Sequence, residues 1–213
     1  MTQLDYERSV FVNCPFDPTY RPLFEAVVFA IYDCGFFPRC ALESEDGTTV
    51  RIDKINQIIS ECRLAVHDIS CTGLDRATRL PRFNMPLELG VFLGAESFGG
   101  EQHGRKAAVI LDVERYRYQK YVSDIAGQDI RAHRRRPAEA IRHVRDFLCS
   151  FCAPGELLPG GEHVAERHAS FRRDLPDACG ALHLRAGRLT FRDLVNLVVG
   201  WMRLNPPWAL SLA

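Results

Sequence analysis

The strongest constraint on the fold is a set of short apolar runs in which hydrophobic residues follow one another with few polar residues between them. The run from Lys106 to Val113 is the clearest case, and Ser9 to Asn13 is a second. A strand with one face in water alternates apolar and polar residues, whereas a strand covered on both faces does not. The runs therefore predict a parallel sheet with helices on both of its faces.

Helical segments separate these runs along the chain, which is the pattern of βαβ units. Right-handed crossovers place the carboxyl ends of the strands at one edge of such a sheet, where ligands bind. We expect strands at Ser9–Asn13, Phe36–Leu42, Leu64–Ile69 and Lys106–Val113, and helices at Tyr20–Cys34, Arg51–Cys62 and Met85–Ala95.

The segment from Met85 to Ala95 is apolar or glycine at every position except Glu88. A helix that is apolar all round is a buried helix. Pro86 suits its first turn, and Asn84 stands where a cap belongs. Glu88 then lies near the positive end of the helix dipole. Because a lone carboxylate in apolar surroundings is costly unless something holds it, Glu88 is the best candidate for chemistry.

The rest of the chain is more helical. Residues 118–130 predict a helix with a short edge strand nearby, and further helices are expected at Pro137–Phe151, Glu162–Arg173 and Thr190–Leu204. We assign residues 1–152 to one α/β domain and residues 153–213 to a helical extension packed on it. The apolar residues of the last helix either cover the sheet or form an assembly face: Phe191, Leu194, Leu197, Val198 and Trp201.

Charge and hydropathy exclude several classes of protein. The 213-residue chain balances 27 Lys and Arg against 27 Asp and Glu, so no global field draws it to nucleic acid or to an anionic membrane. No apolar run reaches the roughly 20 residues of a membrane helix. The amino terminus lacks the apolar core of a signal peptide, and we expect a cytoplasmic protein.

Eight cysteines are present, and most lie in apolar segments where free cysteine packs as a small core residue. Cys149 and Cys152 alone have the spacing of metal ligands, and no second pair accompanies them. Reduced, mostly buried thiols are the favoured interpretation, with a zinc or redox site at this pair as the alternative. We expect no metal in the active site.

A nine-residue motif runs from Arg82 through Asn84 and Glu88 to Gly90, after a strand that ends in Asp68. It resembles the corresponding helix of bacterial TIR-like nucleotide-binding domains and, more distantly, that of nucleoside 2-deoxyribosyltransferases. Both groups share a flavodoxin-like doubly wound parallel sheet, which is the fold that the resemblance implies. In the order of elements, the resemblance extends over about residues 9–150.

The resemblance also implies an activity. Both groups carry on this helix a glutamate that acts at the anomeric carbon of a ribosyl group, and Glu88 matches it. TIR-like enzymes cleave NAD between nicotinamide and ribose, whereas the transferases act on nucleosides and place Asp-x-Gly ahead of the glutamate. This chain has Arg82-Phe83-Asn84 there, which favours the TIR-like side. The resemblance therefore implies an N-glycosidase of NAD or a related nucleotide, acting as a prokaryotic defence effector.

The same resemblance implies ligand contacts. Phe16, Asp17 and Tyr20 match the first loop, which touches the base. Asn84 would orient the glutamate or a ribose hydroxyl, and Arg82 belongs to the same motif. The nucleotide would be the substrate, so no cofactor is expected.

Further candidates follow from the chemistry of a nucleotide. Asp68 and Asp75 can accept hydrogen bonds from ribose hydroxyls and so orient the sugar. The guanidinium groups of Arg39 and Arg51 suit a pyrophosphate, because they bind phosphate oxygens bidentately.

Each candidate also has a structural interpretation. Glu88 can pair with Arg82 or Arg39 as a bridge at the start of its helix. Asp68 can hold a loop at the end of its strand, and Tyr20 can belong to the core or to a lid. A plain cap is enough to explain the asparagine of the motif.

Two other functions compete with the glycosidase. A non-catalytic nucleotide sensor would bind at the same edge and report through the C-terminal helices to a partner protein. A purely structural interaction module would bind no nucleotide. The basic cluster at residues 131–136 lacks interleaved aromatic residues, so we interpret it as a solvated start of a helix rather than a nucleic-acid site. A homo-oligomer or a partner from a defence system fits each function.

Overall fold

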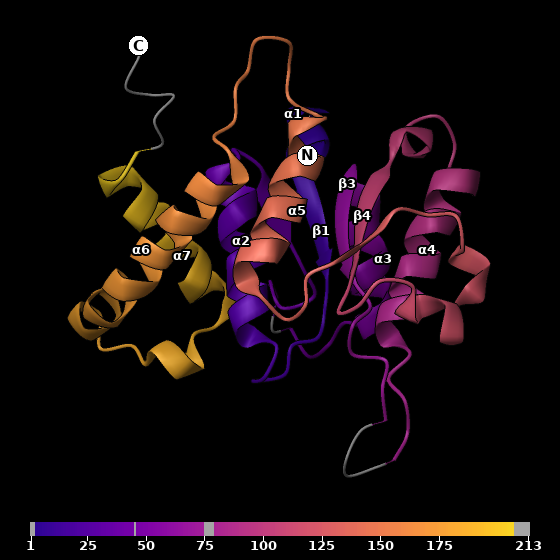
Figure 1. The fold of residues 1–213 in the computed structure, drawn as a ribbon, viewed down its shortest axis with the longest axis horizontal. Coiled ribbons are helices and arrows are strands. Elements are labelled where there is room, and N and C mark those ends of the chain that lie inside the picture. Colours follow the sequence, from indigo (N-terminus) through magenta and orange to yellow (C-terminus); the bar gives the residue numbers. More distant parts are fainter. Residues whose placement is uncertain (1–2, 45, 75–78, 207–213) are drawn as a thin grey trace.

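The structure is a computed structural model that describes residues 3–44, 46–74 and 79–206 of the chain. Helices and strands alternate around a central sheet (Figure 1). The strands are β1 (Ser9–Asn13), β2 (Phe37–Arg39), β3 (Leu64–Asp68), β4 (Ala107–Asp112) and β5 (Ile130–Ala132). The helices are α1 (Gln3–Arg8), α2 (Arg21–Asp33), α3 (Arg51–Glu61), α4 (Asn84–Phe98), α5 (Pro137–Cys149), α6 (Gly161–Ala181) and α7 (Phe191–Leu204), with short 3-10 turns η1 (His103–Arg105), η2 (Arg117–Lys120), η3 (Ser123–Ile125) and η4 (Ala186–Arg188).

The strands of the described residues form one sheet in the order β2-β1-β3-β4-β5, and every neighbouring pair is parallel. Val10 pairs with Leu64, and Leu64 pairs with Ala107, so the three central strands run in step. The first crossover leads from β1 to β2 at one edge, and the next leads back across β1 to β3. The α/β fold with a flavodoxin-like doubly wound parallel sheet is confirmed.

Helices cover both faces of the sheet (Figure 1), with α3 and α4 on one face and α2 and α5 on the other. Phe11 of β1 packs with Ile58 and Phe92 in an apolar cluster under α3 and α4. Val27 and Ile141 belong to a larger cluster under α2 and α5. Burial on both faces explains why the strand sequences are apolar at successive positions rather than at alternate ones.

The C-terminal helices α6 and α7 form a further layer outside α2 and α5 (Figure 1). Phe171 of α6 and Val198 of α7 belong to the same apolar cluster as Phe29 of α2. The rings of Phe29 and Phe171 stack with their centroids 5.4 Å apart. The apolar face of α7 therefore packs within the chain against α2 and α6, instead of covering the sheet directly.

Two ion pairs fasten this outer layer to α2. Arg167 Nη2 lies 2.9 Å from Asp33 Oδ1, and Arg172 pairs with Glu25. Both carboxylates are buried, and a buried carboxylate is tolerated when a guanidinium group is bonded to it. Apolar contacts and paired charges together hold α6 against α2.

The segment between β4 and β5 is not the predicted helix. Residues 118–130 contain only short 3-10 turns before β5 begins. The guanidinium of Arg117 donates to Asp112 Oδ1 and to the carbonyl oxygens of Ile69 and Ser70. These bonds hold the start of the segment against the ends of β3 and β4. The segment follows the edge of the sheet there instead of forming a regular helix.

Two expectations about α4 are wrong. The helix is not buried on all sides, because Leu87 is 58% exposed and Phe98 is 90% exposed, whereas Glu88 is buried. Asn84 is not the cap, since Phe83 occupies that position and provides no side-chain hydrogen bond. The first helical bond runs from the Leu87 N–H to the Phe83 carbonyl at 2.9 Å, which places the cap one residue earlier.

Two elements differ from expectation in length. The strand β2 covers only the first part of its predicted run. Helix α6 continues past Arg173 to Ala181 and contains Pro176. Proline removes a helical hydrogen bond, but Leu175 and Cys179 of the added turns are buried, and their packing compensates for the loss.

Candidate functional site

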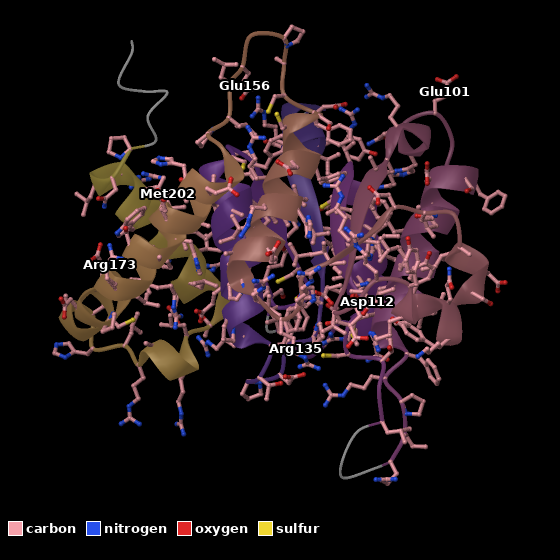
Figure 2. All side chains as sticks on the ribbon, viewed as in Figure 1. Glu101, Asp112, Arg135, Glu156, Arg173 and Met202 are labelled. Carbon is pink, nitrogen blue, oxygen red and sulfur yellow. The ribbon has the colours of Figure 1, made fainter. Side chains whose placement is uncertain are left out.

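The strands β1, β3 and β4 end at the same edge of the sheet, next to the start of α4. In Figure 2, Asp112 and Arg135 lie toward this edge, whereas Glu101 and Glu156 lie at the opposite end of the molecule. The strand order reverses between β1 and β3, and doubly wound folds bind their ligands in the crevice at such a reversal. We therefore compare the positions of the predicted site residues with the strand-order reversal between β1 and β3.

Glu88 lies in the first turns of α4 and is only 7% exposed. Among the described residues, its carboxylate has no hydrogen-bond or ion-pair partner. Burial raises its pKa to about 7, and the positive charge of Arg51, at the start of α3, opposes that rise. A buried carboxylate without a partner destabilises the fold, and such groups concentrate at functional sites.

Arg39 is engaged away from the crevice. Its guanidinium donates to both oxygens of Glu43 at 2.7 Å and to Glu61 at 2.9 Å. These contacts replace the bridge to the α4 carboxylate that the structural interpretation offered. Of the two arginines that suit a pyrophosphate, Arg51 is the one without a described ion pair.

Asp17 and Arg82 form an ion pair at this edge of the sheet, with Arg82 Nη1 3.2 Å from Asp17 Oδ2. Asp17 follows β1 and Arg82 precedes α4, so the pair links the segments on either side of the strand-order reversal. Asp17 Oδ1 also accepts hydrogen bonds from the N–H groups of Thr19 and Tyr20, each at 3.1 Å. Burial opposes ionisation, but these bonds, together with Arg82, lower the pKa of Asp17 overall.

The remaining predicted residues are dispersed. Asn84 is exposed one helical turn before Glu88, at a neighbouring position on the surface of α4. Phe16 is partly buried, and its ring meets that of Phe24 edge to face at 5.4 Å. Asp75 falls outside the described residues.

Asp68 and Tyr20 are bonded to one another inside the protein. The Tyr20 hydroxyl donates to Asp68 Oδ2 at 2.5 Å, and the Ser70 N–H donates to Oδ1 at 2.8 Å. His133 Nε2 lies 3.0 Å from Oδ2, at an angle unfavourable for a hydrogen bond. His133 Nδ1 accepts a hydrogen bond from the Arg135 N–H at 2.9 Å. These polar atoms join the segments that follow β1, β3 and β5.

Asn13 anchors the start of α4. Its side-chain Nδ2 donates to the Met85 carbonyl at 2.8 Å and lies 2.9 Å from His67 Nδ1. The His67 ring is buried between Phe11 and Phe92, and burial lowers its pKa to about 3, so the ring is neutral. In the part of the chain that is described, His67 Nε2 has no partner. The hydrogen bond from Asn13 to the Met85 carbonyl holds the start of α4, and with it Glu88, at the sheet edge.

Two adjoining cavities lie between the loops at this edge and the C-terminal extension. The first, of about 180 Å³, is largely apolar and includes Phe16 and Phe191, together with the charged residues Asp17, Arg21 and Glu25. The second, of about 500 Å³, carries basic and hydroxyl side chains, including Arg51 and Arg188. Glu88 lines neither of these two cavities. Arg51 lines the second, and its positive charge favours the ionised form of Glu88.

Sequence reasoning missed three of the residues that define this region. Lys54 and Arg188 line the second cavity, and His133 meets the buried Asp68. The one available signal for Lys54 was its place one turn after Arg51 on α3. His133 was hidden within the basic cluster, although it follows β5 directly. No local pattern marks Arg188, because its role depends on how the extension packs.

The structure also bears on metal binding, which the spacing of Cys149 and Cys152 left open, and on the expected absence of a membrane helix. Within the described ranges, no group of three or more His, Cys, Asp or Glu side chains is arranged to hold a metal ion. Cys149 is exposed, Cys152 is partly buried, and both are free thiols. None of the described helices is both long enough and apolar enough to cross a membrane.

Comparison of the chain with protein-family models, with curated proteins and with solved structures finds no match. The residues at the sheet edge are therefore the basis for a functional assignment.

Proposed function

We propose that the protein is an N-glycosidase that cleaves NAD or a related nucleotide between base and ribose, with Glu88 acting at the anomeric carbon. One observation carries the proposal: the Glu88 carboxylate is buried without a partner among the described residues, where doubly wound sheets bind ligands. A carboxylate held at this cost is available to a ligand rather than to the scaffold. The resemblance to TIR-like domains adds the role of a prokaryotic defence effector.

The chemistry needs one carboxylate and a good leaving group. When the bond between C1′ and the nicotinamide nitrogen breaks, its electron pair neutralises the positive charge of the ring, so no general acid is required. The cationic ribosyl carbon is then stabilised by the Glu88 carboxylate or bonds to it. Water adds at the same carbon and loses a proton, which yields ADP-ribose and a free carboxylate.

Residues around the crevice would orient the substrate. Asn84 is exposed one turn before Glu88, where its amide can hydrogen-bond a ribose hydroxyl. Asp17, which pairs with Arg82, lines the smaller of the two cavities and would present a charged group to the ligand. Phe16 lines the smaller cavity, and a base can pack against its ring.

The test compares two glutamates of the same helix. Purified protein is incubated with NAD while free nicotinamide is measured, and the melting temperature is recorded with and without NAD. We expect Glu88→Gln to abolish nicotinamide release and Glu96→Gln, at an exposed position of α4, to retain it. Equal release by Glu88→Gln and the wild type would refute the proposal. The proposal would also be refuted if the protein did not cleave NAD and NAD did not raise its melting temperature.

A non-catalytic nucleotide sensor is the second candidate, and one observation favours it. The second cavity is lined both by the loop after β2 and by the segment that begins α7, so a ligand there would touch the C-terminal extension. A sensor predicts that NAD raises the melting temperature without turnover, and that Glu88→Gln leaves this rise unchanged. A purely structural interaction module predicts no effect of any nucleotide.

A further inference from the structure

We infer that the two adjoining cavities form one nucleotide-binding site, in which the C-terminal extension contributes Arg188 to the phosphates and Phe191 to the base. The inference deepens the proposed function and rests on it for the identity of the ligand as a nucleotide. It gives the extension a part in ligand binding that no motif in the sequence indicates.

The two cavities adjoin and share one wall. Leu42, Leu189, Thr190 and Phe191 line both of them. The larger cavity alone, at about 500 Å³, falls within the range of about 300 to 1,000 Å³ that is typical of small-molecule sites. A single ligand with a flat apolar end and an anionic end can therefore occupy both.

The larger cavity is cationic. Arg51, Lys54 and Arg188 line it, and among the described lining residues the one carboxylate is that of Asp46. Asp46 already accepts hydrogen bonds from the backbone and side chain of Thr48. No ion pair with a described residue engages the two guanidinium groups, so their donors are open to phosphate oxygens.

The start of α3 adds to this attraction for anions. The cap residue Val50 has extended backbone and provides no side-chain acceptor for the first N–H groups of the helix. The positive end of the helix dipole therefore faces the loop that lines the cavity. Asp53, the acidic residue of that first turn, does not line the cavity.

The smaller cavity suits the base. Phe16, Phe24 and Phe191 line it, with ring centroids 5.4 Å apart for Phe16 and Phe24 and 6.1 Å apart for Phe24 and Phe191. Aromatic side chains stack on purine and pyridine rings alike, because every base presents a π face. The smaller cavity and the cationic cavity thus match the two ends of a nucleotide.

The wall contributed by the extension is fixed before any ligand binds. Arg21 of α2 donates to the Gly187 carbonyl at 2.8 Å and pairs with the buried Glu25 at 2.7 Å. Thr190 caps α7 through a reciprocal bond with Asp193. A pre-organised wall lowers the entropy lost when a ligand is ordered.

The test measures ligand dissociation constants by calorimetry on the full chain, with inorganic pyrophosphate, NAD and adenosine as probes. We expect Arg188→Ala to raise the Kd for pyrophosphate and for NAD about tenfold, because it removes charge-assisted hydrogen bonds. Adenosine, which has no phosphate, should bind the variant and the wild type equally. Arg185→Ala, at an exposed position outside the cavity, is the matched control and should leave all three constants unchanged.

The outcomes separate this inference from the glycosidase proposal. If Arg188→Ala weakens pyrophosphate and NAD binding but the wild type releases no nicotinamide, the phosphate site stands and the glycosidase proposal fails. If the wild type cleaves NAD and Arg188→Ala does so with an unchanged KM, the glycosidase proposal stands and this inference is overturned. Failure of both pyrophosphate and NAD to bind the wild type also overturns it.

Discussion

The Tyr20 hydroxyl lies 2.5 Å from Asp68 Oδ2, and this buried hydrogen bond joins the loop after β1 to the end of β3. Both residues were candidates for contacts with a ligand. Their bond to each other satisfies both groups inside the protein, while Glu88 remains without a described partner. The sheet edge thus contains a group of polar residues that satisfy one another and a carboxylate that none of them satisfies.

Tyr20→Phe tests the scaffold role. Loss of the hydroxyl leaves a buried carboxylate with one donor fewer, so the free energy of unfolding should fall by about 1.5 to 3 kcal/mol. Urea denaturation measures this change, and Tyr116→Phe is the control because Tyr116 is 66% exposed. If Tyr20 only supports the loop, the Kd for NAD stays unchanged. A large rise in Kd with normal stability would instead assign Tyr20 to the ligand.

Protonation of Glu88 should make stability depend on pH. Burial raises its pKa from 4.5 to about 7, so the folded state favours the protonated form. The stabilisation from this shift is fully present below about pH 4.5 and is lost as the pH rises through 7. Relative to Glu88→Gln, the wild type should lose on the order of 2 to 3 kcal/mol between these limits. Urea denaturation at pH 4.5 and pH 8 measures the change. Glu96→Gln retains Glu88 and should lose as much stability between these pH values as the wild type does. If the wild type lost the same amount relative to Glu96→Gln as relative to Glu88→Gln, the prediction would be contradicted.

The pH dependence of cleavage should report the same carboxyl group. Glu88 must be ionised to stabilise a cationic ribosyl carbon, so kcat should rise with pH up to about 7 and then level off. Arg51 favours the ionised form, and Arg51→Ala should move this acidic limb to higher pH. Lys54→Ala is the control, since it alters the same cavity without acting on Glu88. If the acidic limb of the kcat profile stayed at the same pH in Arg51→Ala, Glu88 would not be the group that titrates.

The cap of α7 offers a test of the extension alone. Thr190 accepts a hydrogen bond from the Asp193 N–H at 3.1 Å, and Asp193 Oδ2 accepts one from the Thr190 N–H at 3.0 Å. Thr190→Ala should lower the free energy of unfolding by about 1 kcal/mol. Thr190→Ser keeps the hydroxyl and should recover most of this loss. Equal stability of the alanine and serine variants would show that the cap is dispensable.

The sheet could be predicted because a strand that is buried on both faces needs apolar residues at successive positions of its sequence. Successive apolar residues such as Val109, Ile110 and Leu111 are required where helices cover each side. The surroundings of α4 could not be predicted in this way. Its apolar composition does not reveal which side faces the sheet, and none of the described elements covers Leu87 or Phe98.

The candidate site was predictable only in part. Glu88 stands out in sequence as the single charge between Met85 and Ala95, and the structure buries it. The contact of His133 with Asp68 depends on the position of β5, and the place of Arg188 depends on the packing of the extension. Contacts between segments so distant along the chain leave no local periodicity or motif to detect.

The stacking of Phe29 on Phe171 has a consequence for any shortened form of the protein. A chain ending at residue 152 would present Phe29 to water and would leave Asp33 without its ion pair to Arg167. Glu25 would lose Arg172 and keep Arg21 as its partner. Such a fragment should aggregate or be degraded by proteases rather than persist as a minimal catalytic unit. Truncation at the apparent domain boundary would thus remove part of the interior, and fusion partners are better attached beyond α7.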